Sequence, residues 1–488
     1  MTKYRYMKNS NRININSRIY TPTRFPNTIG EKRGRRYAFV LILIVISYLS
    51  YLLFSQWNTT PGEHLFLGSI VVILGFMPTF LYFWKGMKDS VPLMALHGLF
   101  YTFSFGFVAF ADINQLIRPG DEYLTKALAF TIAGLVLLYI GYYVVAGLIF
   151  RSQQPFQFPS RITINEISIW GWVFESFYLV SLIYFSDTRI PSIEHFIPVL
   201  GWLGKGILLY QFFKGNMPVV GRILLWGGVI PYELIAGVAT GAFAPVVTIL
   251  IFIGVVILGT KKRLPVFIVI LSLISVIISQ PLKAEYRSVI WRGSGSHLNV
   301  FEKAHLFLTI AKEYYVDGQS FAQASSDFSS RTDHLGTTAA IIAQTPQIIP
   351  YLHGLTYINL LTSWIPRIAW PNKPKEDFGN VWAKWYGLMG SSDFETSYNL
   401  PWLPEFYMNF GILGILGGML MVGVFFRFLA IKFCSGAHSP IEFLIGLTLT
   451  FRLFFAESNL SLMIGSTIPV FVALYITMRV ISAARSRP

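Results

Sequence analysis

The chain has 488 residues, of which 53% are hydrophobic and only 13% are charged, and its formal net charge is +15. A soluble core cannot use many apolar runs of about 20 residues, whereas a bilayer with about 30 Å of hydrocarbon requires helices of that length. The composition therefore excludes an ordinary soluble protein and predicts a polytopic membrane protein.

Twelve apolar runs, taken in chain order, have the length of transmembrane helices. They cover residues 37–54, 64–84, 91–111, 127–150, 168–185, 193–213, 223–240, 244–260, 266–282, 403–426, 438–456 and 462–478. The first lacks a small-residue cleavage site and is expected to be an uncleaved anchor. Runs seven and eight can equally be read as a broken pair. The predicted fold is all-α, with a nine-helix region, 37–282, and a three-helix region, 403–478.

Charges in the connectors predict how these helices are oriented. With the N-terminus inside, basic residues fall in cytoplasmic connectors, whereas the short outward connectors are acidic. Residues 1–36 hold ten Lys or Arg against one acid, Glu31, which predicts a disordered basic cytoplasmic tail, and a second basic tail spans 479–488. We therefore expect these basic residues to contact the lipid bilayer and not nucleic acid.

The segment 283–402 is the one long stretch that resembles neither a span nor a short connector, and it is predicted to face outward. Residues 282–402 hold ten Lys or Arg, ten Asp or Glu, and six of the twelve Trp residues of the chain. Apolar spacing predicts helices over 299–316 and 335–349, which suggests a helical cap on the membrane. The chain has no nucleotide motif and no convincing metal-ligand spacing, so no cofactor and no metal are expected.

Two basic clusters in this loop have the chemistry to bind phosphate. Arg287 and Arg292 follow the ninth span, where they either hold an anionic headgroup or anchor the helix end. Arg367, Trp370 and Lys373 lie in a proline-rich segment. That segment is either a structural turn or a rigid support for cations that stabilise a diphosphate leaving group, with Trp370 against a sugar ring.

Three groups have the chemistry of a general base. Glu405 and Asn409 lie four residues apart at the outer end of the tenth span, where Glu405 is either a solvated helix start or a base partly removed from water. His334, which follows Asp333, and His353 are the alternatives, although a polar loop face is the simpler explanation for His334. The loop tyrosines, Tyr351 and Tyr357 among them, either stack on carbohydrate or form an interfacial belt.

Six ionisable residues fall inside the predicted spans, where burial is costly and function is therefore suspected: Glu175, Lys205, Glu233, Glu442, Arg452 and Glu457. Glu442 and Glu457 lie near span ends and are interpreted as interfacial. Arg452, in the outer half of the eleventh span, either reaches a lipid diphosphate or pairs with a Glu of a neighbouring span.

Motifs across about 283–418 resemble the oligosaccharide repeat-unit polymerases, the Wzy-type O-antigen or exopolysaccharide polymerases. In order, they are Lys283-x-x-Tyr286-Arg287, Arg331, Thr345-Pro346 with Pro350-Tyr351-x-x-Gly354, Pro366-Arg367-x-x-Trp370-Pro371-x-Lys373-Pro374, and Glu405-x-x-x-Asn409-Phe410-Gly411-x-x-Gly414. The span count and the single dominant outer loop also resemble the family. Members often have two prominent outer loops, and here only one is long, which leaves open how donor and acceptor sites are divided.

The resemblance implies a multi-pass glycosyltransferase of the bacterial inner membrane, with both termini in the cytoplasm. It would join glycan repeat units carried on undecaprenyl diphosphate at the periplasmic face, and a separate chain-length regulator is a further partner by analogy. Arg287, Arg331 and Arg367 would contact donor or acceptor. Two alternatives remain open: an O-antigen ligase-type glycan transferase, and a transporter or flippase of lipid-linked sugars. A transporter would depend on Lys205 and Glu233, whereas a polymerase would tolerate a neutral residue at Lys205.

These interpretations define the expected site. The expected catalytic residues are Glu405, Arg287, Arg367, His334 and His353. The expected substrate-binding residues are Arg292, Arg331, Tyr351, Tyr357, Trp370, Lys373, Asn409 and Arg452. We expect Arg287, Glu405 and Arg452 to converge at the outer ends of spans nine, ten and eleven.

Overall fold

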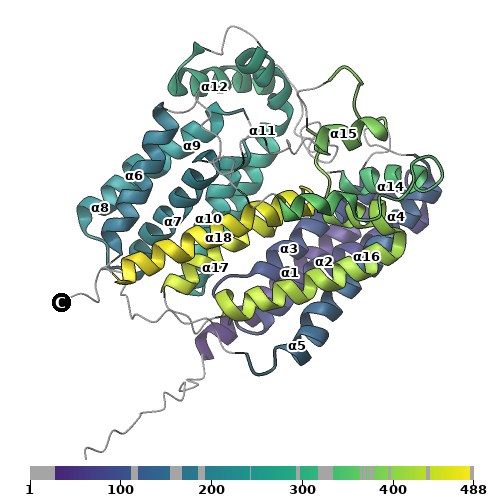
Figure 1. Cartoon of the computed structure of the whole chain (residues 1–488), viewed down its shortest axis with the longest axis horizontal. Coiled ribbons are helices and arrows are strands. Elements are labelled where there is room, and N and C mark those ends of the chain that lie inside the picture. The colour runs from purple at the N-terminus through teal and green to yellow at the C-terminus, as the bar shows by residue number, and fades with distance from the viewer. Residues whose placement is uncertain are drawn as a thin grey trace, which may run out of the picture.

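The fold is seen in a computed structural model of the whole chain (Figure 1). It describes residues 28–111, 119–153, 167–184, 193–241, 243–292, 297–316, 333–362, 365, 370, 372, 378–393, 397–435 and 440–483. Within these residues every regular element is a helix, which confirms the predicted all-α class.

The N-terminal half consists mainly of apolar helices. Its elements are α1 (Thr28–Gln56), α2 (Gly62–Trp84), α3 (Leu93–Tyr101) with η1 (Thr102–Gly106) and η2 (Phe107–Phe110), α4 (Asp121–Tyr139) with η4 (Ile140–Val145), and α5 (Ala146–Ile149). They are followed by α6 (Ser168–Tyr184), α7 (Ile193–Lys214), α8 (Val219–Leu224), η5 (Leu225–Val229), α9 (Ile230–Ala239), α10 (Ala244–Lys261) and α11 (Val266–Arg292).

The remaining elements come from the large loop and the C-terminal helices. The loop contributes α12 (Val300–Val316), α14 (His334–Gln344), η7 (Leu355–Leu361) and α15 (Phe378–Trp385). The chain then continues through α16 (Trp402–Leu429), η8 (Ala430–Cys434), α17 (Pro440–Leu453) and α18 (Leu460–Ala483).

Membrane crossing is supported for part of the predicted topology. Seven helices of the described chain are long and apolar enough to span a bilayer, or eight if the bent helix α11 is counted as one span. The protein is therefore a multi-pass helical membrane protein, and each of the twelve predicted spans overlaps a described helix. One helix outside this set, the 14-residue α17, is about 21 Å long, which is shorter than the hydrocarbon layer.

Two helix boundaries differ from the sequence-based expectation. Helix α1 begins at Thr28, so residues 28–36 of the predicted disordered tail are helical. Helix α11 continues to Arg292, ten residues beyond the predicted span end at 282, and bends by 46° between Val266–Ser279 and Pro281–Ile290. The bend lies at Pro281, because proline lacks the amide hydrogen and its ring crowds the preceding turn.

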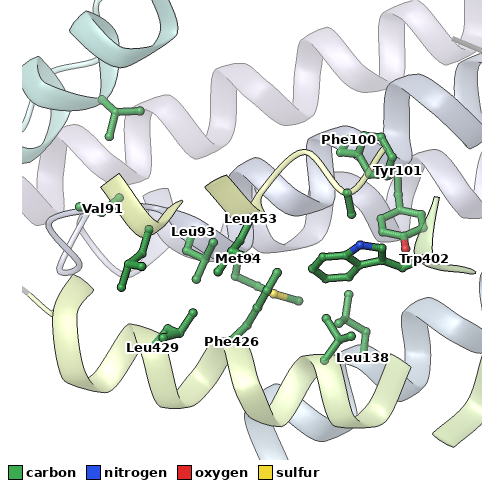
Figure 2. Close-up of a cluster of buried hydrophobic side chains, with 14 of the residues drawn as sticks. Val91, Leu93, Met94, Phe100, Tyr101, Leu138, Trp402, Phe426, Leu429 and Leu453 are labelled. Carbon is green, nitrogen blue, oxygen red and sulfur yellow. The ribbon is translucent and has the colours of Figure 1, made fainter. Parts of the chain in front are cut away.

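One apolar core joins the N-terminal helices to the C-terminal ones. Figure 2 shows part of it, with the Trp402 indole close to Tyr101, Leu138 and Phe426. The Trp402 and Phe426 rings lie 6.0 Å apart in an edge-to-face arrangement. The start of α16 is thus packed against α3 and α4, and the polar groups that follow Trp402 stand on a rigid base.

The helices of the large loop pack on two different parts of the molecule. Helix α12 matches the predicted helix 299–316 and packs against α9 and α11 in a separate apolar cluster that includes Phe243, Tyr286 and Phe307. Helix α14 ends at Gln344, five residues before the predicted end at 349, and packs against α4 and α16. Figure 1 shows α12 over α9 and α11, and α14 beside α4 and α16. The loop is therefore built onto the membrane helices.

Candidate functional site

A break in helix α16 shapes a buried polar cluster next to the turn between α17 and α18. Phe410 (φ −142°, ψ 17°) and Gly411 (φ 62°, ψ −149°) leave helical geometry and separate residues 402–409 from the rest of the helix. The Gly411 conformation is one that only glycine adopts at low cost. A Cβ atom at this position would also lie 2.7 Å from the Tyr351 hydroxyl. The Asn-Phe-Gly motif therefore marks a kink.

Replacing Gly411 by Ala is expected to destabilise the protein by about 1–3 kcal/mol, because the side chain strains the backbone and meets Tyr351. Thermal unfolding of the purified protein in detergent measures the effect. The matched control is Gly417→Ala in the same helix, where a Cβ atom meets nothing within 4 Å. Equal unfolding temperatures for the two variants would contradict the strain at Gly411.

The broken helix end is closed by the loop that precedes η7. Carbonyl groups freed at the kink accept amide hydrogens from this loop: Leu352 N–H bonds Met408 O at 3.0 Å, and His353 N–H bonds Asn409 O at 3.1 Å. The Asn409 side chain accepts from Gly354 N–H at 2.9 Å and donates to Thr356 Oγ1 at 2.9 Å and to Glu405 O at 2.8 Å. Both of its amide hydrogens are used within the protein. Asn409 therefore joins the two segments and has no hydrogen to donate to a substrate.

Glu405 lies beneath this junction and is completely buried, with 0% exposure. Its Oε2 accepts the Leu460 amide hydrogen at 2.6 Å, so it satisfies an N-terminal amide of α18. Its Oε1 accepts no hydrogen bond among the residues that the structure describes, and the Thr356 hydroxyl lies nearby. The predicted role as general base requires contact with an acceptor hydroxyl. The bond to Leu460 makes Glu405 a group that positions α18, and its role as general base stays a prediction.

Tyr357 completes the buried polar cluster formed by Glu405, Asn409, Thr356 and Ser461. The Ser461 hydroxyl donates to Thr356 O at 2.5 Å, and the Tyr357 ring stacks 6.5 Å from Phe410. Burial, and secondarily the negative charge of Glu405, raises the pKa of Tyr357 above its ordinary value. The phenol therefore stays protonated at neutral pH and can act only as a neutral hydrogen-bonding group.

A second group of polar residues surrounds the turn between α17 and α18. His334, at the start of α14, has its Nε2 3.7 Å from Glu457 Oε1, and the His334 ring packs against Phe100 and Phe105. The side chain of Glu457 is 25% exposed, whereas that of His334 is 6% exposed. The interpretation of Glu457 as merely interfacial missed this pairing, because α14 and the turn are far apart in sequence. The one available signal was an acid inside an apolar run.

Arg452 lies in the last turn of α17, immediately before the same turn. It is half-buried and makes no ion pair or hydrogen bond with any other described residue, so the alternative in which it pairs with a Glu is not seen in this part of the chain. Nearby, the His97 Nδ1 atom from α3 lies 2.9 Å from Phe454 O and holds the turn. The turn therefore combines a His–Glu pair with a cation that lacks a protein counter-ion among the described residues.

Of the other expected site residues, Arg287 adjoins α12, whereas Tyr351 and His353 lie in the loop that closes the break in α16. Arg287 donates through Nε to Gly241 O at 2.8 Å, at the turn between α9 and α10, and adjoins the separate cluster with α12. Neither contact involves Glu405 or Arg452, and the expected convergence of the three residues stays a prediction. His353 is exposed at φ 48°, and the Tyr351 ring lies 6.2 Å from that of Tyr407.

Several expected residues cannot be placed in the site. Arg331, Arg367 and Lys373 lie outside the described residues, as does the side chain of Arg292. Trp370 is half-buried and its immediate neighbours are outside the described chain. The described residues hold no group of three or more His, Cys, Asp or Glu side chains suited to a metal ion.

A third polar group is buried between α6, α7 and α9. The Lys205 ammonium bonds Glu233 directly and lies 3.5 Å from Glu175 Oε1. The ammonium also lies 5.2 Å from the centroids of the Tyr178 and Trp202 rings. All three charged side chains are almost fully buried. Lys205 is thus accommodated by two carboxyl groups from neighbouring helices, which the sequence did not pair.

Fold and sites together define a polytopic helical membrane protein with a polar cluster at one end of its C-terminal helices and a buried charge cluster among α6, α7 and α9. Comparison of the chain with protein-family models, with curated proteins and with solved structures gives no match. The resemblance to repeat-unit polymerases therefore rests on the sequence motifs alone.

Proposed function

We propose that this protein is a membrane glycosyltransferase that polymerises oligosaccharide repeat units carried on undecaprenyl diphosphate. The observation that carries the proposal is the contact between His334 and Glu457 in the turn between α17 and α18, with Arg452 five residues before Glu457 in the last turn of α17. A base and a cation, here one with no ion pair among the described residues, are the two functions needed to transfer a glycosyl group from a diphosphate carrier. The predicted topology places this turn at the periplasmic face of a bacterial inner membrane, with twelve spans and both termini in the cytoplasm.

In the proposed reaction, the His334–Glu457 pair and Arg452 have separate roles. An acceptor hydroxyl attacks the anomeric carbon of the donor, and its proton passes to the His334–Glu457 pair, of which Glu457 is the more exposed member. The bond between the anomeric carbon and the diphosphate oxygen breaks, and its electron pair leaves with the diphosphate. The Arg452 guanidinium stabilises the developing negative charge. A single displacement of this kind inverts the anomeric configuration.

Glu405 and Asn409 support this turn and do not touch the substrate in this account. Glu405 holds the first amide of α18, and Asn409 ties the loop before η7 to the broken end of α16. The loop arginines Arg331 and Arg367 remain proposed contacts to donor or acceptor, as the motif resemblance implies.

Replacing Arg452 by Ala tests the proposal. We expect about 10²- to 10³-fold slower polymerisation, the effect of removing one group that stabilises transition-state charge. Long glycan chains should be lost from cells while single repeat units accumulate on the lipid carrier. The matched control is Arg263→Ala, an exposed residue in a predicted cytoplasmic connector. Normal chain length at normal protein level in the Arg452 variant would refute its assigned role.

A transporter of lipid-linked sugars is the second candidate, and the Glu175–Lys205–Glu233 cluster is the observation that favours it. Ionisable groups buried among membrane helices are typical of ion and substrate pathways. The triple substitution Glu175→Gln, Lys205→Met and Glu233→Gln removes the charges together. A transporter would lose activity in this variant, whereas a polymerase would retain its product length.

A further inference from the structure

The cluster formed by Glu175, Lys205 and Glu233 has an unbalanced charge. It contains two carboxyl groups and one ammonium group, and all three side chains are almost completely buried. Other titratable or charged groups facing it are limited, within the described chain, to the Tyr178 phenol. With both carboxyl groups ionised, the cluster would carry one uncompensated negative charge inside an apolar bundle, which is strongly unfavourable.

The hydrogen bonds of the cluster are also incomplete. Lys205 bonds one oxygen of Glu233, and neither Glu175 oxygen nor the second Glu233 oxygen has a hydrogen-bond partner in the part of the chain that the structure describes. The two carboxyl groups nevertheless lie close enough to act on each other. A proton on one of them would supply a donor where only acceptors are present.

A metal ion does not suit the cluster. Hard cations such as Ca²⁺ or Mg²⁺ need six or more oxygen ligands, whereas this cluster offers two carboxyl groups whose centre is occupied by the Lys205 ammonium. A proton needs only one of the free carboxyl oxygens and no additional space. Gly204 packs against Glu175, with the position of its absent Cβ only 3.2 Å from Glu175 Oε2, so little room remains.

We propose that Glu175, Lys205 and Glu233 form a proton-binding site that holds one proton between the two carboxyl groups at neutral pH. Glu175 is the main bearer of this proton, because Glu233 bonds the Lys205 ammonium directly and is stabilised as the carboxylate. The bound state is electrically neutral, with one carboxylic acid, one carboxylate and one ammonium group. This inference concerns a site separate from the α17–α18 turn and does not depend on the proposed function.

Infrared difference spectroscopy of the purified protein tests the site, because a protonated carboxyl group has a carbonyl stretch separate from carboxylate bands. Subtracting the spectrum of Glu175→Gln from that of the wild type at neutral pH should reveal one carboxylic acid band, which shifts in deuterated water. The control Glu63→Gln removes an exposed carboxyl group and should reveal carboxylate bands only.

A second variant keeps the test decisive if Glu175→Gln folds poorly. In Glu233→Gln, Glu175 becomes the single counter-ion of Lys205 and should ionise, so the same acid band should again be lost relative to the wild type. Difference spectra that contain carboxylate bands but no acid band, for both variants, would overturn the proposal.

Discussion

Replacing Lys205 by Met is expected to destabilise the protein by about 3–5 kcal/mol, because it leaves two buried carboxyl groups without their shared cation. Thermal or denaturant unfolding in detergent measures the loss. The control Lys214→Met removes an exposed lysine from the end of the same helix and should have little effect.

The triple variant Glu175→Gln, Lys205→Met, Glu233→Gln separates this charge effect from simple loss of packing. Replacing all members of a buried ion cluster by neutral groups is often neutral or stabilising, so we expect it to recover most of the lost stability. A triple variant as unstable as Lys205→Met would contradict the electrostatic explanation. Because Lys205→Met is expected to destabilise the fold, a loss of activity in this variant would not distinguish a transporter from a polymerase. The triple variant is therefore the proper test of transport.

Replacing Glu457 by Gln is expected to slow polymerisation by about 10²- to 10⁴-fold, the range for loss of a general base. The amide keeps the shape of the side chain but cannot take a proton from an acceptor hydroxyl. Radiolabelled or fluorescent repeat units incorporated into long chains by membranes containing the variant measure the rate.

Two further variants serve as comparisons for the Glu457 variant. Glu63→Gln, an exposed acid at the start of α2, is the matched control and should leave the rate unchanged. Glu405→Gln should act mainly through stability, because Glu405 caps α18 and is not exposed. The assignment of Glu457 would be contradicted if the Glu457 variant kept the wild-type rate while the Glu405 variant folded normally but was inactive. Glu405 would then be the general base.

The sequence predicted the helices better than the site, and the reason is physical. Apolar runs and connector charges are local signals, so the helices appear near their predicted positions, including α12 within one residue of its predicted start. The bend at Pro281 and the kink at Gly411 also have visible local signals. The backbone break at Gly411 was nevertheless not predicted.

The ion pairs within the sites could not be predicted from such local signals. Lys205 meets Glu233 and Glu175 across three helices, and Glu457 meets His334 across more than a hundred residues of chain. Such contacts depend on how helices pack, and no spacing rule specifies them. Glu405 was chosen for its position at a helix start, but its burial and its bond to Leu460 depend on where α18 begins.

The most direct test of the proposed polymerase is to delete the gene and analyse lipid-linked glycans in the two leaflets of the inner membrane. The proposal predicts single repeat units on undecaprenyl diphosphate in the outer leaflet, together with loss of long chains, and recovery when the wild-type gene is restored. Full-length chains retained on the carrier, or intermediates confined to the cytoplasmic leaflet, would contradict it.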